Sequence, residues 1–194
     1  MRTKNKNKRK NKSKKVFNNN DYNSGDGMLT AVWGPSLWHT LHTISFNYPV
    51  NPSNNDKKQY KKFIKQLKHI LPCKYCRVNL KRNFKCLPLT NKHMKNRETF
   101  SKYIYDLHEL INKMLKKKSN LEFDDIRIRY EHFRARCNKK KTFKKIIKKE
   151  KGCIDPLYGT KSKCIIKIVP QQTDCETFQM NKKCETKRYT QKNK

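Results

Sequence analysis

The sequence predicts an all-α protein: a four-helix bundle plus a short fifth helix, between a disordered basic N-terminus and a small cysteine-containing C-terminal extension. Three observations support this prediction. Residues 28–136 hold both Trp, all six His and most of the other aromatic residues, so the core belongs there. Apolar residues in this segment recur every three or four positions, which is the helical period. The only strand-like run, residues 164–169, lies outside it.

Net charge separates the flanks from the central segment. The chain carries +34, of which residues 1–27 contribute +7, residues 28–136 contribute +15 and residues 137–194 contribute +12. Residues 1–27 have almost nothing to bury, so we expect a disordered basic tail, whereas residues 28–136 have the length of one domain. The excess of Lys and Arg indicates either a solvated surface or attachment of the tails to an acidic or polyanionic partner.

Membrane and secretory functions are not indicated. No run of about 18 apolar residues is present that would span a bilayer. The charged N-terminus is followed by no apolar core, so we expect no secretory signal peptide.

The first two helices are delimited by prolines and a capping serine. Gly34-Pro35 is typical of a helix start. The prolines at positions 49 and 52 break this helix, and Ser53 can cap the next one. The apolar face of the first helix consists of Leu37, Trp38, Leu41, His42 and Ser45. That of the second consists of Tyr60, Phe63, Ile64, Leu67, Ile70 and Leu71.

Three further helices follow. Pro72 ends the second helix and starts a third, which puts Cys73 and Cys76 on a first helical turn. A fourth helix runs from about Asn96 to Leu115, and a short fifth from Phe123 to Phe133. Their apolar residues are Phe100, Tyr103, Ile104, Leu107, His108, Ile111, Met114, Leu115, Ile126, Tyr130 and Phe133. Amphipathic helices with such short connections favour a bundle.

The most reactive feature of the sequence is the pair Cys73-x-x-Cys76. The positive end of a helix favours a thiolate, so this pair on a first turn suits thiol–disulfide exchange. One alternative is a zinc site in a basic nucleic-acid-binding protein, with Cys86 and His93 completing four ligands at an unusual spacing. Another is a buried structural pair.

Three motifs of the central segment are similar to those of one known family. The stretch WGPSLWHTLHTISFNYP resembles an opening G-x-x-x-W-x-x-L-H…Y-P, and FIKQLKHILPCKYC resembles F-I…P-C-x-x-C. The stretch LHELINKMLKKK resembles L-H-N-x-V-N-x-x-L-G-K, and Arg129-Tyr130 stands where the family often has Arg-Trp. Residues 33–133 therefore resemble the Erv/ALR FAD-linked sulfhydryl oxidases, especially the branch encoded by large nucleocytoplasmic DNA viruses.

The resemblance implies a fold, a cofactor and a reaction. The family fold is a compact helical bundle, usually a homodimer, that binds FAD and catalyses 2 R–SH + O₂ → R–S–S–R + H₂O₂. It implies that Cys73 exchanges with the substrate and that Cys76 faces the flavin. The cofactor-binding residues that it implies are Gly34, Trp38, His42, Tyr48, His108, Asn112, Lys117 and Tyr130, with no metal ligand. It further implies disulfide formation in virion proteins, in the host cytoplasm or viral factory and in the virion.

The chain departs from the family pattern at three positions. Glu109 replaces the Asn that follows the third-motif His, which affects one contact to the flavin nucleotide. Tyr105 and Asp125 stand where animal and fungal members have a structural disulfide, so packing has to replace that bridge. An inactive bundle that keeps the fold is therefore a further alternative.

The other histidines and cysteines have no role by resemblance. We expect the side chains of His39, His69, His93 and His132 at the surface. The five C-terminal cysteines either relay electrons to the central pair or pair with one another in a small folded unit, which we favour. They are Cys137, Cys153, Cys164, Cys175 and Cys184.

Overall fold

The computed structural model describes residues 18–135, 153–157, 160–175 and 179–184. Its longer helices are α2 (Thr30–Phe46), α3 (Asn54–Ile70), α4 (Lys74–Cys86), α5 (Arg97–Met114) and α6 (Phe123–Glu131). The short helical segments are α1 (Asn19–Tyr22), η1 (Lys92–Met94) and η2 (Lys182–Cys184). An isolated bridge between Ala135 and Pro156 is the only β-pairing among the described residues. No helix in these ranges is long and apolar enough to cross a membrane.

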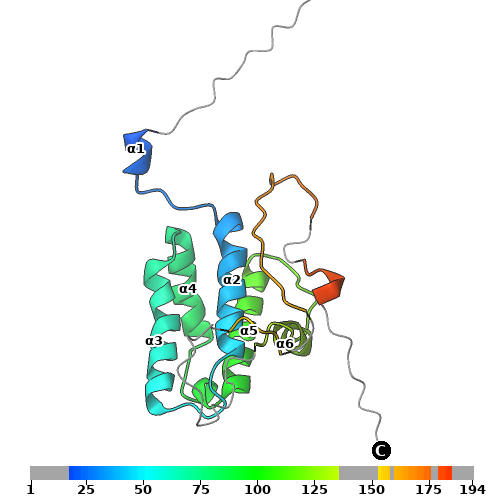
Figure 1. Ribbon diagram of the computed structural model, residues 1–194. Helices are drawn as coiled ribbons and strands as arrows, with labels where there is room; N and C mark the ends of the chain where they lie inside the picture. The colour runs from blue at the N-terminus through cyan, green and yellow to red at the C-terminus, as the bar shows by residue number, and fades with distance from the viewer. Residues whose placement is uncertain (1–17, 136–152, 158–159, 176–178, 185–194) are drawn as a thin grey trace, which may run out of the picture.

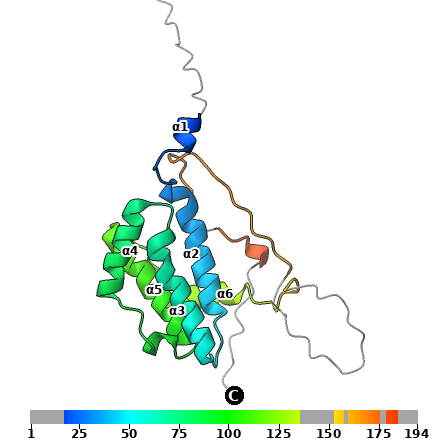
Figure 2. The ribbon, with the colours of Figure 1, turned by 90° about the vertical axis from the view of Figure 1, so that its left-hand side faces the viewer.

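Four helices stand side by side and the fifth lies across them, which confirms the predicted architecture. Figures 1 and 2 show α2 to α5 as an upright bundle with α6 crossing it. Helix α2 packs against α5 and α6, α3 against α4, and α4 against α5. The buried core between them consists of Leu41, Tyr48, Ile64, Leu67, Leu71, Leu80, Leu89, Met94, Phe100, Tyr103, Ile104 and Leu107.

Local signals in the sequence fix two helix starts. Ser53 Oγ accepts the backbone N–H of Asp56 at 3.1 Å, and the Asp56 carboxylate accepts the backbone N–H of Ser53 at 2.8 Å. Asn96 and Thr99 form the same reciprocal cap at the start of α5. Each such capping box satisfies two backbone donors that the helix itself leaves unpaired. The predicted starts at both positions are confirmed.

The predicted start of the first long helix is wrong by one turn. Helix α2 begins at Thr30, and Pro35 lies inside it. The extra turn is held by a distant contact and a local one: the N–H of Met28 donates to the Pro72 carbonyl at 2.8 Å, and Trp33 Nε1 donates to the Met28 carbonyl at 3.1 Å. Because Pro72 is far from Met28 in sequence, the pattern around Gly34-Pro35 does not reveal the first contact.

Helix α6 is attached to the bundle by an aromatic contact. The Tyr105 hydroxyl donates to the Leu121 carbonyl at 2.8 Å, and its ring meets that of Phe123 edge-on at 5.8 Å. Lys102 Nζ lies 5.0 Å from the Tyr105 ring centre. Packing of Tyr105 therefore holds the connection between α5 and α6, where animal and fungal relatives were expected to have a disulfide.

The outer segments differ from the expectations in three ways. Residues 18–27, expected to be disordered, include α1, which is closed by a capping box from Asn18. Residues 164–169 are not a strand, and Ile165 is 76% exposed. The thiols of Cys164, Cys175 and Cys184 are free, so these three do not pair, whereas Cys153 is disulfide-bonded. Residues 1–17 and Cys137 lie outside the described residues.

Several apolar side chains that were predicted to face the core are exposed. These are Phe63, Ile70, Met114, Leu115 and Phe133. Each lies at the margin of its helix's apolar face or at a helix end, where periodicity does not distinguish core from surface.

Candidate redox site

The two close cysteines form a disulfide at the N-terminus of α4. Cys73 is the N-cap residue, and its Sγ accepts the backbone N–H of Cys76 at 3.2 Å. The two sulfurs are bonded, with a Cα–Cα distance of 5.2 Å, and both residues are half-buried. The prediction that the pair lies on a first helical turn is confirmed. When the disulfide opens, the helix N-terminus favours the thiolate that is released. We call residues 72–76 the redox turn.

The segment before α2 lies directly on the redox turn. A Cβ atom on Gly27 would lie 2.8 Å from the Pro72 carbonyl oxygen, so only glycine fits this close approach. Three residues on, the Thr30 hydroxyl lies 3.7 Å from Cys76 Sγ. Sequence reasoning assigned Gly27 to the tail and missed both contacts. The only local signal is a glycine just before the first apolar run.

A cluster of histidine and aromatic rings forms where α2, α5 and α6 meet. The rings of Trp38 and His108 stack with centroids 3.9 Å apart. His42 Nε2 lies 3.1 Å from His108 Nδ1, and the His42 ring lies 5.3 Å from that of Tyr130. His39 Nδ1 lies 3.2 Å from the Tyr130 hydroxyl. We call these five residues the histidine–aromatic cluster.

Burial keeps the central histidines neutral. Desolvation, together with the nearby His108 and His39, lowers the pKa of His42 to about 3. The pKa of His108 is lowered to about 4, mainly by desolvation; Glu109 acts against this shift and Lys117 acts with it. A single proton therefore occupies the space between the two imidazoles, with one ring donating and the other accepting. Burial also raises the pKa of Tyr130, which keeps its hydroxyl protonated.

The C-terminus of α5 forms a lysine-lined hollow of about 450 Å³. The N–H of Lys117 donates to the Asn112 carbonyl at 2.8 Å, and that of Lys116 donates to Lys113. This is a Schellman motif, in which Lys116 takes the left-handed conformation with φ 55°. The residues around the hollow are Glu109, Lys113, Lys116, Lys117, Lys118, Ser119 and Asn120. Such a hollow suits an anionic ligand.

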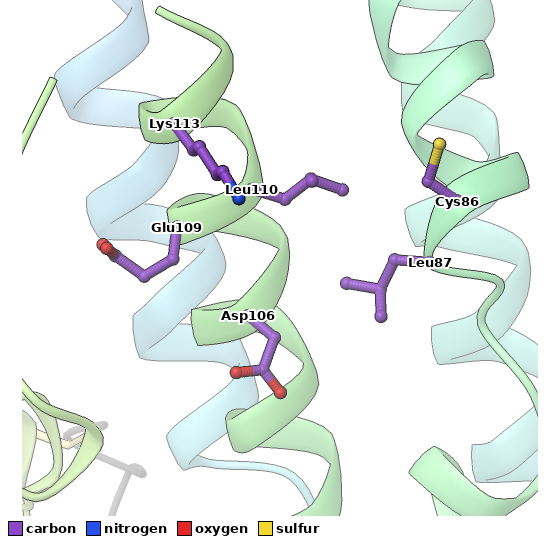
Figure 3. Close-up of a pocket in the computed structure, with 6 residues that line it drawn as sticks. All are labelled: Cys86, Leu87, Asp106, Glu109, Leu110 and Lys113. Atoms are coloured by element: carbon purple, nitrogen blue, oxygen red, sulfur yellow. The ribbon is translucent and has the colours of Figure 1, made fainter. Parts of the chain in front are cut away.

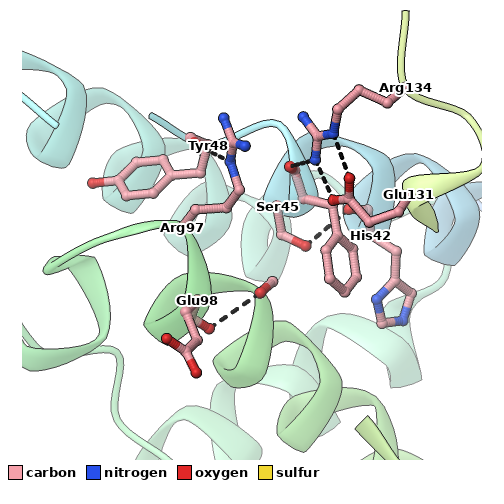
Figure 4. Close-up of polar contacts among 9 residues, drawn as sticks. His42, Ser45, Tyr48, Arg97, Glu98, Glu131 and Arg134 are labelled. Carbon is pink, nitrogen blue, oxygen red and sulfur yellow. Dashed lines mark hydrogen bonds and ion pairs between the residues drawn. The ribbon is translucent and has the colours of Figure 1, made fainter. Parts of the chain in front are cut away.

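Two arginine side chains bind backbone carbonyls at and just beyond the C-terminus of α2. Figure 4 shows Arg97 and Arg134 reaching carbonyl oxygens where this helix ends. Arg97 Nε donates to the Tyr48 carbonyl at 2.7 Å, and Arg134 Nη2 donates to the Phe46 carbonyl at 2.9 Å. Glu131 forms an ion pair with Arg134. The contact with Phe46 satisfies a carbonyl that the helix leaves unpaired, and both contacts hold the C-terminal end of the helix that carries His42.

The structure does not favour the zinc alternative. Cys73 and Cys76 are bonded to each other, and Cys86 lies at the opposite end of α4. Cys86 lines a hollow of about 410 Å³ between α4 and α5. Figure 3 shows Cys86 with the other residues of this hollow. The Nδ1 atom of His93 is hydrogen-bonded to the backbone N–H and the hydroxyl of Thr90. The described residues contain no group of three or more His, Cys, Asp or Glu that could hold a metal.

Residues 35–134, just over half of the chain, match the sequence model of the Erv1 / Alr family. The chain belongs to the Erv1 / Alr family. It is 34% identical over 91 residues to the "Probable FAD-linked sulfhydryl oxidase" of Acanthamoeba polyphaga mimivirus, covering 47% of this chain and 64% of that protein. It is 31% identical over 86 residues to the FAD-linked sulfhydryl oxidase of African swine fever virus, covering 44% and 70%.

The chain is also similar to yeast proteins of the family. The mitochondrial FAD-linked sulfhydryl oxidase of Saccharomyces cerevisiae is 29% identical over 84 residues, which is 43% of either protein. The crystal structure of the yeast Erv1 core is 21% identical with a TM-score of 0.48, covering 65% of this chain and 96% of that one. The chain thus spans less than two thirds of the mimivirus and yeast proteins.

Within the Erv1 / Alr domain, the cofactor-binding residues expected by resemblance fall in different places. Trp38, His42, His108 and Tyr130 lie together in the histidine–aromatic cluster. Asn112 and Lys117 lie at the C-terminus of α5, where Asn112 Nδ2 donates to Glu109 Oε1 at 2.9 Å. Glu109, which stands where the family has Asn, is therefore hydrogen-bonded to Asn112, a residue expected to contact the cofactor.

The remaining two expected residues, Tyr48 and Gly34, lie apart from both the cluster and the end of α5. Tyr48 is fully buried and donates its hydroxyl to the Met94 carbonyl at 3.1 Å, with its ring packed on Tyr60 and Phe100. Gly34 lies inside α2, and only Thr30 comes near its Cβ position, at 3.7 Å. Tyr48 is therefore a core residue. At Gly34, no other segment of the described chain comes close enough to require a glycine.

The expectation that four histidines lie at the surface is wrong for three of them. His39 belongs to the histidine–aromatic cluster, and burial lowers its pKa. His93 is half-buried against the Tyr103 ring at 4.8 Å, and His132 is also half-buried. Only His69 is exposed. Helical position alone did not identify these contacts, because their partners come from other helices.

Proposed function

We propose that this chain is an FAD-dependent thiol oxidase that forms disulfide bonds in protein substrates and reduces O₂ to H₂O₂. The observation that carries the proposal is the Cys73–Cys76 disulfide at the N-terminus of α4, inside an Erv1 / Alr domain. Viral and yeast relatives bear the name FAD-linked sulfhydryl oxidase. A redox disulfide on a helical scaffold needs an electron acceptor, which fits a flavin enzyme.

The residues of the site fit FAD. Trp38 and His108 offer flat ring surfaces for stacking, and His42 Nδ1 is buried without a hydrogen-bond partner. The hollow at the end of α5 has four lysines for a pyrophosphate, with Lys117 among them. Trp38, His42, His108, Asn112, Lys117 and Tyr130 would hold the cofactor. Bound FAD would supply the two-electron acceptor between the dithiol and O₂.

The protein's own step is thiol–disulfide exchange at the redox turn. A substrate thiolate attacks Cys73 Sγ, the bond to Cys76 breaks, and Cys76 leaves as a thiolate. A second substrate thiolate then attacks the mixed disulfide, which releases oxidised substrate and leaves both cysteines reduced. Cys76 packs against the core cluster, whereas Cys73 caps the helix, so Cys73 is the better entry point. The Thr30 hydroxyl and the start of α4 stabilise the departing thiolate.

We extend the proposal to the setting of the reaction, with the viral relatives as support. The chain acts as a homodimer on dithiols of virion proteins, in the host cytoplasm or viral factory, and is itself a candidate virion component. The basic tails attach it to an acidic or polyanionic partner. Size-exclusion chromatography with light scattering tests the dimer, and fractionation of purified virions tests the location.

One preparation of the full chain tests the activity. A purified protein with flavin absorption in the visible range, and with dithiol-dependent oxygen uptake that disappears in Cys76→Ser, supports the proposal. Cys86→Ser is the matched control, because its thiol is exposed and lies at the other end of α4. A colourless protein with stoichiometric zinc contradicts it. Bound flavin without turnover of any thiol indicates an inactive structural bundle.

A further inference from the structure

We propose that the outer surface of α3 and α4, next to the redox turn, is a docking surface for acidic, thiol-bearing protein segments. This names the substrate class of the proposed oxidase and rests on that function for its ligand. Three features of this surface support the proposal. It lacks acidic residues, many of its basic side chains are exposed, and apolar side chains lie beside the disulfide.

The segment that carries the disulfide contains no carboxylate side chain. Residues 57–97 hold 14 Lys and Arg and no Asp or Glu, although the domain has acidic residues on either side. This segment comprises most of α3, the redox turn, α4 and η1. Asp56, the last acid before it, is engaged in the cap of α3 at the end remote from the redox turn. The segment therefore carries a charge of +14, most of it on the two helices that flank the redox turn.

Nine of the 14 basic side chains of this segment are exposed, and seven of these nine lie on α3 and α4. On α4, Lys74, Lys81, Arg82 and Lys85 are exposed at helical spacing. On α3, the exposed lysines at the same kind of spacing are Lys58, Lys62 and Lys65. The described ion pairs all lie outside residues 57–97. These cations are available to a partner, and their mutual repulsion would be relieved by its carboxylates.

Apolar side chains beside the disulfide indicate that the partner is a protein. Tyr75, between the two cysteines, is 80% exposed, Ile70 is 66% exposed, and Val78 is 45% exposed. Exposed aromatic and aliphatic residues within a polar rim are typical of protein interfaces. A nucleic acid would favour a series of aromatic stacking platforms, whereas Tyr75 stands alone on the redox turn. The surface therefore has apolar side chains next to the disulfide and basic side chains around them.

Distance decides which cations act on a substrate thiol. Lys81 and Arg82 follow Cys76 on α4 by roughly 8 Å along the helix axis, within the screening length of about 10 Å at 0.1 M salt. Lys57 and Lys58 lie at the opposite end of α3, roughly 20 Å away. The double variant Lys81→Glu/Arg82→Glu and the double variant Lys57→Glu/Lys58→Glu change the net charge equally. Because their charge change is equal and their distance from the disulfide differs by more than a screening length, they form a matched pair.

The test measures the exchange step itself, without flavin turnover or oxygen. A reduced peptide with two cysteines flanked by glutamates is compared with the same peptide carrying glutamines. Under anaerobic conditions, the opening of the Cys73–Cys76 disulfide in the full chain is followed by acid quench, alkylation and peptide mapping. We expect the glutamate peptide to react about 10-fold faster at low salt, and the ratio to approach one at high salt. Lys81→Glu/Arg82→Glu should remove most of this ratio, and Lys57→Glu/Lys58→Glu should leave most of it.

Each other outcome overturns the inference. Equal rates for the two peptides at low salt contradict it directly. An equal loss in both double variants indicates long-range net charge rather than a surface at the redox turn. Displacement of the glutamate peptide by an equal charge of single-stranded DNA, with DNA binding the more tightly, assigns the surface to nucleic acid. A failure of the proposed oxidase is distinguishable, because oxygen uptake would then be absent while the exchange rates remain measurable.

Discussion

The neutral histidine pair makes the stability of the domain depend on pH in the mildly acidic range. His42 and His108 have folded-state pKa values of about 3 and about 4, both below the ordinary value of 6.5. The unfolded chain therefore binds more protons than the folded chain once the pH falls below about 6.5. Stability is fully present above that pH and is lost progressively as the pH falls toward the folded-state values.

The size of the effect follows from these values. Lowering the pH from 7.5 to 5.0 should cost about 2 kcal/mol of unfolding free energy per histidine, or about 4 kcal/mol for the pair. This is a large fraction of the stability of an ordinary domain. Protonating both rings also sets two N–H donors against each other across the 3.1 Å contact, so the hydrogen bond is lost as well.

Urea unfolding followed by circular dichroism, at constant ionic strength, measures this dependence. His108→Phe keeps a ring against Trp38 and removes one titrating group, so its loss of stability between pH 7.5 and 5.0 should be about 2 kcal/mol smaller than that of the unmodified chain. His69→Gln is the control, because this exposed side chain lies away from the pair. If His108→Phe and His69→Gln show the same pH dependence as the unmodified chain, the buried neutral pair is refuted.

Three further substitutions test the redox turn and the end of α5. Gly27→Ala puts a methyl group 2.8 Å from a backbone oxygen of the redox turn and should lower the unfolding free energy in urea by about 1–3 kcal/mol, whereas Gly25→Ala has nothing within 4 Å and should be neutral. Thr30→Val removes the hydroxyl beside Cys76 Sγ and should lower the disulfide reduction potential in thiol buffers by roughly 10–30 mV, whereas Thr30→Ser should not. Lys116→Gly removes a left-handed non-glycine residue and should raise stability by about 1 kcal/mol in thermal unfolding, whereas Lys116→Ala should not. Equal behaviour within any of these pairs contradicts the contact concerned.

Local chemistry made most of the fold predictable from the sequence. The cap at Ser53 and the stop at Pro72 depend on residues within one turn of the helix end, so the sequence carries them directly. The same holds for the redox turn, because Pro72 sets the start of the helix that Cys73 caps. The family motifs added the prediction that Trp38 and His42 belong to one site.

Features that depend on distant partners were not predictable. The start of α2 depends on the contact of Met28 with Pro72, and Tyr48 is held in the core by Met94. The run at residues 164–169 has strand propensity but no partner strand among the described residues, and propensity alone does not make a strand. His39 looked like a surface residue because Tyr130, its partner, is 91 positions away.

The stoichiometry of thiol oxidation tests the central claim most directly. The purified full chain is given a reduced dithiol peptide in air, and loss of thiols, uptake of O₂ and formation of H₂O₂ are measured together. The account predicts one H₂O₂ for each disulfide formed, with the flavin spectrum retained, and no turnover in Cys73→Ser or Cys76→Ser. Thiol oxidation that continues unchanged in both variants, or a chain that takes up no flavin, would contradict it.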